Sequence, residues 1–305
     1  MIIRERPAAW RLFFAVRGSI LHRIKWEVTT TVCIAIGVTI LHGRVFDTKI
    51  TLTPIPFSLI GLALAIFLGF RNSSTYDRWW EGRKQWGDLV IHARSLARLC
   101  QNHIAPRDGD DLVGVQVRRI IAFTHSLRHA LRGSEDKDSA AFLPVSERAA
   151  LLGSVNPPNR ILAAFSDDLA KAAAAGRVTP MMAAVIEENV TALAGVQAGC
   201  ERISGTPLPF SYTLLLHRTA HMYCLMLPFG LVDTIGFATP VVVGLISYTF
   251  FGLDTIADEI EDPFGMLPNN LPLDALSRRI EIDLRDALGE TDLPEMLQPV
   301  ESCLM

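Results

Sequence analysis

The stretch of sequence that decides the fold is PIPFSLIGLALAIFLGFRNSSTYDRWWEGRKQW, residues 54–86. It is apolar over residues 55–70 and then turns abruptly polar, as a single helix does when it leaves a membrane and continues into water. Leu62, Ile66 and Phe70 are spaced four residues apart, so they lie along one slowly drifting stripe of that helix. Small residues are interleaved with the stripe and let membrane helices approach closely: Gly61, Ala63, Ala65 and Gly69. We interpret this stretch as the wall of a pore.

The residues just beyond the stripe are hydrophilic. Asn72, Ser73 and Asp77 would suit a wet vestibule next to a dry constriction, or a role in ion selectivity. They are mixed with basic residues such as Arg71 and Arg78, and spacing alone does not say which of these side chains face the ion. The alternative interpretation of the stripe is a surface that faces lipid or the protein core, which is the more frequent meaning of such a pattern.

Composition indicates a membrane protein and argues against several other classes. Hydrophobic residues make up 50% of the 305 residues, and the mean hydropathy is +0.28. A net charge of −3 gives no strong field that would attract nucleic acid. The five cysteines are far apart and form no CxxC pair, so neither a disulfide framework nor a zinc site is expected.

The sequence also lacks the short patterns of common enzymes. It has no GxGxxG, no Walker loop, no GxSxG and no HExxH. Two histidine pairs at i, i+4, His125 with His129 and His217 with His221, have no third ligand at a recognisable spacing. We therefore expect no enzyme activity, no cofactor and no bound metal.

The N-terminal part of the chain favours a membrane hairpin. Residues 1–27 are basic and amphipathic, which is typical of a helix that lies along a membrane surface. An apolar run at 28–41 and the stretch from residue 54 then predict a transmembrane hairpin over 28–86. Basic residues flank both ends of this hairpin, so the positive-inside rule places its flanks in the cytoplasm.

The rest of the chain predicts a helical region, a second hairpin and a tail. Residues 87–206 show helical periodicity over 87–104, 111–133, 158–175 and 180–203, which indicates a cytoplasmic helical region. A second transmembrane hairpin is expected at 207–253. A cytoplasmic acidic segment and a C-terminal helix at 274–288 occupy 254–305. The predicted fold class is an all-α membrane protein with four transmembrane helices, a large cytoplasmic helical domain and both termini in the cytoplasm.

Three long stretches resemble the bestrophin family, and they occur in the family's order. The first, PFSLIGLALAIFLGFRNSSTYDRWWEGRKQWG, covers the second span. The others are GCERISGTPLPFSYTLLLHR at 199–218 and ISYTFFGLDTIADEIEDPFGMLPNNLPL at 246–273. With the opening MIIRERPAAW, the resemblance covers essentially the whole chain and is closest in kind to the bacterial members.

The resemblance implies a homopentameric ion channel of the bacterial inner membrane, with one central pore on the five-fold axis. Leu62, Ile66 and Phe70 match the family's apolar neck, although the first position is Leu here. Met181, in GRVTPMM, matches a second constriction at the cytoplasmic exit. Rings of such side chains would form a dewetting gate rather than a filter of coordinating oxygens. The implied partners are other copies of the chain, the permeating monovalent ions and the lipid bilayer.

The resemblance to bacterial members also implies a cation preference, so sodium is the expected ion. Two alternatives stay open: an anion (chloride) channel of the same architecture, and a membrane-anchored helical scaffold that binds a cytoplasmic partner. The family's animal members are activated by calcium through an acidic run just after PFG. Here PFG is followed by MLPNN, and calcium sites need several carboxylates, so calcium activation of that kind is not expected.

Overall fold

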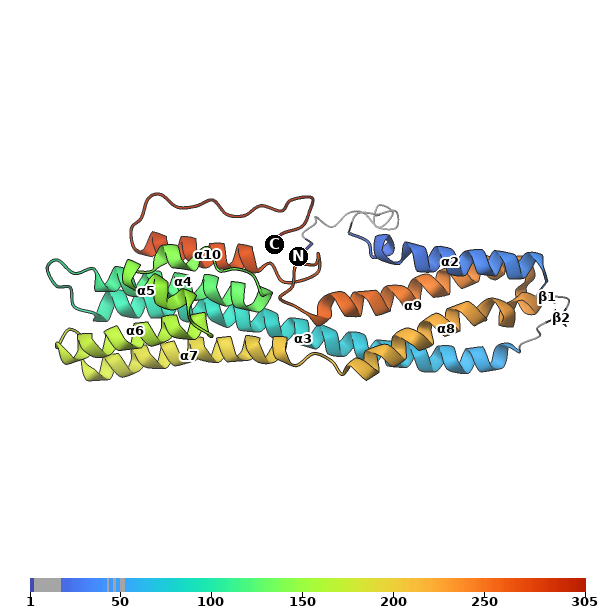
Figure 1. Ribbon diagram of the computed structural model, residues 1–305, viewed down its shortest axis with the longest axis horizontal. Coiled ribbons are helices and arrows are strands. Elements are labelled where there is room, and N and C mark those ends of the chain that lie inside the picture. The colour runs from blue at the N-terminus through green and yellow to red at the C-terminus, as the bar shows by residue number, and fades with distance from the viewer. Residues whose placement is uncertain (3–17, 43, 46–47, 50–52) are drawn as a thin grey trace. The chain divides into compact units, whose positions relative to one another are not determined.

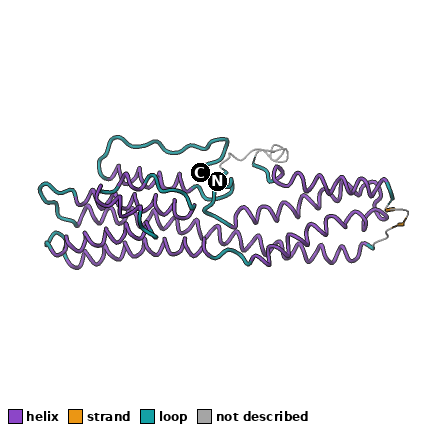
Figure 2. The backbone as a smooth tube through the Cα atoms, in the orientation of Figure 1, coloured by secondary structure: helices purple, strands orange, loops and turns teal. Residues whose placement is uncertain are grey.

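The computed structural model describes residues 1–2, 18–42, 44–45, 48–49 and 53–305, and most of these are helical (Figures 1 and 2). The α-helices are α2 (Leu21–Ile40), α3 (Pro54–His103), α4 (Leu112–Arg132), α5 (Val145–Leu152), α6 (Pro157–Ala174), α7 (Pro180–Gly205), α8 (Phe210–Ile235), α9 (Thr239–Glu261) and α10 (Leu273–Ala287). Two short 3-10 helices are η1 (Ser139–Phe142) and η2 (Gly236–Ala238). The strands among the described residues are β1 (Arg44–Val45) and β2 (Thr48–Lys49), an antiparallel pair between α2 and α3. The predicted all-helical class is thus confirmed, while residues 3–17 of the predicted N-terminal helix lie outside the described residues.

The chain divides into two compact units. The unit called here the apolar unit contains the described residues from 18 to 79 together with Pro207–Asp262. The unit called here the polar unit contains Trp80–Thr206 and Pro263–Met305, together with Met1 and Ile2. Helix α3 contributes residues to both units, because the division falls between Trp79 and Trp80.

Two predicted boundaries fall inside continuous helices. The sequence predicted that a surface helix ends and a membrane span begins at residue 28. Helix α2 instead runs without interruption from Leu21 to Ile40, through that boundary. Helix α3 runs to His103 without interruption, so the predicted boundary after Trp86 is not a break either. The reason is the same in both places: no proline lies within Leu21–Ile40, and none follows Pro56 in α3, so nothing removes a helical hydrogen bond.

The apolar unit buries one side of each of its four long helices in a common core. The buried members of this core are Ile24, Ala35, Leu64, Leu68, Leu216, Ala220, Tyr223, Cys224, Leu227, Val243, Phe250 and Phe251. Gly61 lets α3 approach α8 closely, since a Cβ built there would lie 2.6 Å from the Tyr223 hydroxyl oxygen. This supports the sequence-based interpretation that small residues on α3 permit close helix contact.

The helices of the polar unit begin at residues that satisfy their first backbone N–H groups. The Asp111 carboxylate accepts a hydrogen bond from the Gly114 N–H, and the Asn156 side chain accepts one from the Asn159 N–H. The Thr179 hydroxyl accepts one from the Met182 N–H, just before Pro180 opens α7. These caps explain why α4, α6 and α7 begin within one residue of their predicted starts. The short helix α5 was not predicted from the sequence.

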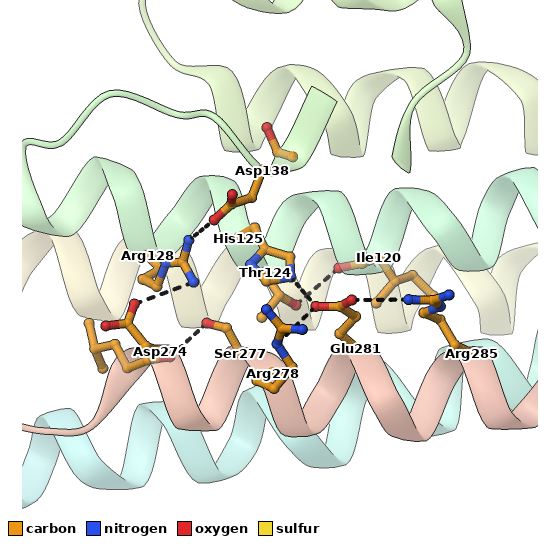
Figure 3. A network of polar contacts seen from close by, with 12 residues as sticks. Ile120, Thr124, His125, Arg128, Asp138, Asp274, Ser277, Arg278, Glu281 and Arg285 are labelled. Atoms are coloured by element: carbon orange, nitrogen blue, oxygen red, sulfur yellow. Dashed lines mark hydrogen bonds and ion pairs between the residues drawn. The ribbon is translucent and has the colours of Figure 1, made fainter. Parts of the chain in front are cut away.

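A polar network joins α4 to α10 inside the polar unit (Figure 3). The His125 Nε2 lies 3.1 Å from the Glu281 carboxylate, and Arg128 lies 3.3 Å from Asp274. Burial would raise the pKa of the Glu281 carboxyl, but the hydrogen bond from His125 and the nearby Arg278 outweigh it and hold that pKa below its ordinary value of 4.5. His125 therefore serves the packing of α4 against α10.

Candidate functional site

The candidate pore face is one exposed side of α3. Leu62, Ile66 and Phe70 are 61%, 49% and 62% exposed. Leu64 and Leu68, which lie between them in the sequence, are 2% and 0% exposed and belong to the core of the apolar unit. The three predicted neck residues therefore share a face that the unit itself does not cover. Large apolar side chains on an exposed face indicate that something covers them in the functional protein: lipid, a second subunit or the walls of a dry constriction.

The polar residues beyond the stripe do not all share that face. Ser73 and Asp77 are exposed, and they follow Phe70 at steps of three and four residues, which keeps them on its side of the helix. Asn72 is different, because its Nδ2 donates to the Leu68 carbonyl at 2.9 Å and to the Leu253 carbonyl on α9 at 3.1 Å. The Asn72 side chain therefore ties α3 to α9. Its predicted place in a vestibule stays a prediction.

A buried arginine follows the stripe directly. Arg71 is 1% exposed and lies among three carboxylates of α9. Its guanidinium contacts Asp254 at 2.5 Å, forms an ion pair with Asp258 and lies 3.6 Å from Glu261. The three acids are spaced i, i+4 and i+7, so they line one face of α9. A single arginine can hold several carboxylates because its donors form a fixed fork.

This arrangement corrects the predicted acidic tail. The sequence interpretation began a cytoplasmic acidic segment at residue 254. Instead α9 continues to Glu261, and its acids pair with Arg71 inside the apolar unit. The available signal was the i, i+4, i+7 spacing of the acids, together with an arginine at the end of an apolar run. Their partnership was hidden because Arg71 and Asp254 are 183 residues apart.

Helix α8 joins the same group of charges. The His217 Nδ1 lies 2.8 Å from the second carboxylate oxygen of Asp254. The His221 ring lies 4.2 Å from the His217 ring, centre to centre. We call Arg71, Asp254, Asp258, Glu261 and His217 the Arg71 cluster. At its margin, Arg78 Nε donates to the Glu261 carbonyl at 2.6 Å, and Arg23 pairs with Glu259 at 2.7 Å.

Met181 lies in the polar unit, at the second position of α7. Its side chain is 77% exposed, and the Thr179 cap followed by Pro180 fixes where the helix presents it. An exposed apolar side chain at this place agrees with the predicted exit constriction. Its role stays a prediction, because the side chain contributes to a constriction only in an assembly.

The calcium and metal expectations can be compared with the local structure. After Pro263 and Phe264 the chain folds back on itself: the Asn270 side chain accepts from the Leu267 N–H at 2.5 Å, and the Leu271 N–H donates to the Pro263 carbonyl at 2.8 Å. The side chains here are amide and apolar, which does not provide the carboxylates that calcium prefers. Within the part of the chain that the structure describes, no group of three or more His, Cys, Asp or Glu is placed to hold a metal ion.

Comparisons with known sequences agree on one family. The family described as Bacterial/Fungal Bestrophin protein matches residues 1–286. A "voltage-dependent anion channel-forming protein" of Mesorhizobium japonicum is 42% identical over 300 residues, which are 97% of this chain and 95% of that protein. The Escherichia coli K12 protein of the same description, YneE, is 39% identical over 302 residues, which are 98% of each.

Solved structures agree with the sequence comparisons. A crystal structure of a bacterial bestrophin homolog from Klebsiella pneumoniae is 38% identical, with a TM-score of 0.82. The similarity covers 88% of this chain and 99% of that one. At this identity and TM-score the similarity extends to the fold of most of the chain.

Proposed function

Since the chain belongs to the bacterial and fungal bestrophin family, we propose that it is a channel that passes small monovalent anions passively across a membrane. The pore is built by several copies of the chain, five by the family resemblance, with the α3 helices around a common axis. Its narrowest part is the neck, formed by rings of Leu62, Ile66 and Phe70. The channel-named relatives also point to a protein that is not an enzyme.

The exposed stripe on α3 is the observation that supports this proposal most strongly. Leu62, Ile66 and Phe70 face away from the core of their own unit, and Ser73 and Asp77 continue that face as polar residues. An apolar ring followed by polar side chains is the arrangement of a constriction that opens into a wet vestibule. Exposure alone does not make a pore, since Phe67 on another side of α3 is also 49% exposed. The order of apolar and polar residues on one face is what distinguishes the stripe.

The choice of anions departs from the sodium preference that the sequence resemblance implied. The relatives of known description in M. japonicum and E. coli are named for anions, which supports the alternative that the sequence left open. A neck of Leu62, Ile66 and Phe70 offers no oxygen atoms to replace the water around a small cation. Chloride and larger monovalent anions hold their water less tightly than sodium does. An apolar neck therefore costs them less free energy to cross.

The proposed topology has four spans in the bacterial inner membrane, with both termini in the cytoplasm. The spans are α2, the first part of α3, α8 and α9. Two stretches support it by length and apolar composition, namely Pro54–His103 and Phe210–Glu261, the second of which contains both α8 and α9. Met181 would then lie at the cytoplasmic exit of the pore, and Ser73 and Asp77 in the vestibule behind the neck.

Reversal potentials test the ion selectivity directly. The purified full-length protein is reconstituted in planar bilayers with a potassium chloride gradient, and the voltage of zero current is measured. We expect that voltage to lie near the chloride equilibrium potential. When nitrate or iodide replaces chloride on one side, the voltage should shift away from its value in chloride, in the direction that indicates a higher permeability for the less hydrated anion. A value near the potassium equilibrium potential would contradict anion selectivity. The absence of current would contradict the channel function.

Neck variants test which face of α3 lines the pore. Replacing Leu62, Ile66 and Phe70 together by alanine should widen and wet the constriction and raise the single-channel conductance. Ile66→Ala and Phe67→Ala form a matched pair, because both side chains are 49% exposed and neighbours in the sequence. Only Ile66→Ala should raise the conductance. Equal effects of the two would show that the stripe does not line the pore.

A further inference from the structure

Arg71 occupies a position from which it can control the neck. It is the residue after Phe70, yet the two side chains point to different sides of α3: Phe70 is 62% exposed and Arg71 is 1% exposed. Successive residues of a helix are turned by about 100°, so any rotation of α3 moves both side chains together. The contacts that hold Arg71 therefore also determine where Phe70 points. We infer that the Arg71 cluster positions the neck and makes its width respond to protonation of His217, an inference that rests on the proposed function of the neck.

Arg71 can position α3 because its buried guanidinium is bonded to α9 at two places. Its guanidinium bonds to Asp254 through one terminal nitrogen and pairs with Asp258 through the other, and both acids belong to α9. The side chain of Asn72, one residue further along α3, donates to the Leu253 carbonyl, also on α9. Two adjacent residues of α3 thus bond to two adjacent residues of α9. A rotation of α3 would break these contacts and leave buried charges without partners.

The charges of the cluster do not balance. One guanidinium faces three carboxylates, those of Asp254, Asp258 and Glu261. The nearby Arg78 compensates in part through the Glu261 carbonyl, and Arg23 is already paired with Glu259. An added positive charge is therefore favourable at this place. His217 is the group that can supply it.

His217 is the accessible end of the cluster. Its side chain is 52% exposed, whereas that of Asp254 is 4% exposed and that of Arg71 is 0% exposed. Asp254 bonds to Arg71 through one carboxylate oxygen and to His217 through the other, so it joins α3 to α8. The other titratable group that faces His217 is His221, whose ring lies beside it on α8.

The sign of the pH effect follows from these contacts. Protonation of His217 converts its hydrogen bond to Asp254 into a charge-assisted one, which is shorter and stronger. It also reduces the negative excess around Arg71. The cluster is then held more firmly at acid pH, and α3 stays in the orientation that narrows the neck. When His217 loses that proton, the cluster loosens and current increases.

The first experiment compares histidine variants in planar bilayers at about pH 5.5 and about pH 8. In the native protein we expect at least about fivefold more current at the higher pH, the low end of typical coupling between sites. His217→Gln should abolish that difference. His221→Gln, which leaves the contact between His217 and Asp254 in place, should retain it. Native currents that are equal at the two pH values, or a His217→Gln protein that keeps the difference, would overturn the inference while leaving the channel function intact.

The second experiment removes or preserves the buried charge. Arg71→Lys keeps a cation beside Asp254 and should keep the pH difference with a changed conductance. Arg71→Met removes the cation that the three acids share and the link between α3 and Asp254, and it should abolish the difference. Because Arg71→Met can also prevent folding, the double variant with Asp254→Asn, which removes one of the excess acids, provides the comparison. A double variant that assembles, conducts and still shows the native pH difference would overturn the inference. A native protein without current at any pH would overturn the proposed channel function and the inference with it.

Discussion

The apolar unit and the polar unit are built from the same kind of helix, but they place apolar and charged side chains in opposite ways. Most of the exposed large hydrophobic side chains belong to the apolar unit, including Trp26, Leu59, Met222 and Leu245. The polar unit directs its large apolar side chains inward, with Phe123 and others in its core. Its helices carry many ion pairs at their edges, such as Arg94 with Asp283.

The buried charges show the same contrast. In the described part of the apolar unit they are concentrated in the Arg71 cluster and at its margin, where Glu259 is buried. In the polar unit they are spread over several pairs, and Arg119, for example, pairs with Glu147 and Asp168, whose side chains are each 26% exposed. Lipid does not hydrate charged side chains. The few charged side chains of a unit that lipid surrounds are therefore stabilised only by pairing with one another. The difference between the units therefore indicates two solvents, lipid around one and water around the other.

The largest expected effect comes from adding a charge to the outer surface of each unit. Leu245 is 68% exposed in the apolar unit, and Val155 is fully exposed in the polar unit. Leu245→Lys should cost about 2.5–3.5 kcal/mol of insertion free energy if the side chain lies near the middle of the bilayer. Val155→Lys should stay within about 0.5 kcal/mol of the native stability. The fraction of protein that resists alkaline extraction from membranes measures the first, and thermal unfolding in detergent measures both. Equal losses of stability in Leu245→Lys and Val155→Lys would contradict the inference that lipid surrounds one unit and water the other.

A smaller effect is expected from acid in the polar unit. The pKa of Glu281 is held below 4.5, so its contribution to stability is fully present above pH 4.5 and is lost as pH falls through the lower value of the folded state. The loss should be on the order of 1.5–3 kcal/mol, as for a hydrogen bond to a charged group. Hydrogen exchange of α10 amides against pH measures it.

Two variants sharpen that measurement. Glu281→Gln should remove most of the acid-dependent exchange in α10, because its partner His125 on α4 then has no carboxylate to bond. Glu188→Gln, an exposed acid on α7, should leave the pH profile unchanged. If both variants keep the native profile, Glu281 does not couple α10 to α4.

The smallest effect concerns cysteine labelling. Cys33 is exposed on α2 of the apolar unit, and Cys200 is buried on α7 of the polar unit, where burial raises the pKa of its thiol to about 12. A charged maleimide should not label Cys33 in membranes, because lipid excludes the reagent. It should not label Cys200 before unfolding either, because burial disfavours the thiolate, which is the reactive form. Labelling of Cys33 by the charged reagent, measured by intact-protein mass, would place that face of α2 in water.

Much of the fold could be predicted because its signals are local. Helix α4 was predicted at 111–133 and is found at Leu112–Arg132, since a capping aspartate and a terminal glycine mark its ends. The stripe of Leu62, Ile66 and Phe70 was predicted from periodicity, and the structure leaves all three side chains exposed on α3. Its role as a neck stays a prediction.

The contacts that the sequence did not reveal are distant in sequence. Asn72 was grouped with the polar residues around it, and its partner Leu253 is 181 residues away. The acids from Asp254 onward were assigned to an acidic segment, because nothing near them indicates Arg71. Periodicity shows which face of a helix is polar. It does not show which other helix that face meets.

The distance between Arg71 and Asp254 also has a consequence for how the protein is made. The ribosome finishes Arg71 183 residues before Asp254, a delay of about 10–40 s at ordinary rates of synthesis. During that interval the first hairpin carries a cation at the end of its apolar run with none of its three acids yet in existence. Insertion of this chain is therefore a two-stage event. We expect the first hairpin to reach its final depth in the membrane only after the second hairpin has been inserted. Until then the Arg71 guanidinium has no carboxylate partner, and quality-control proteins of the cell can recognise it.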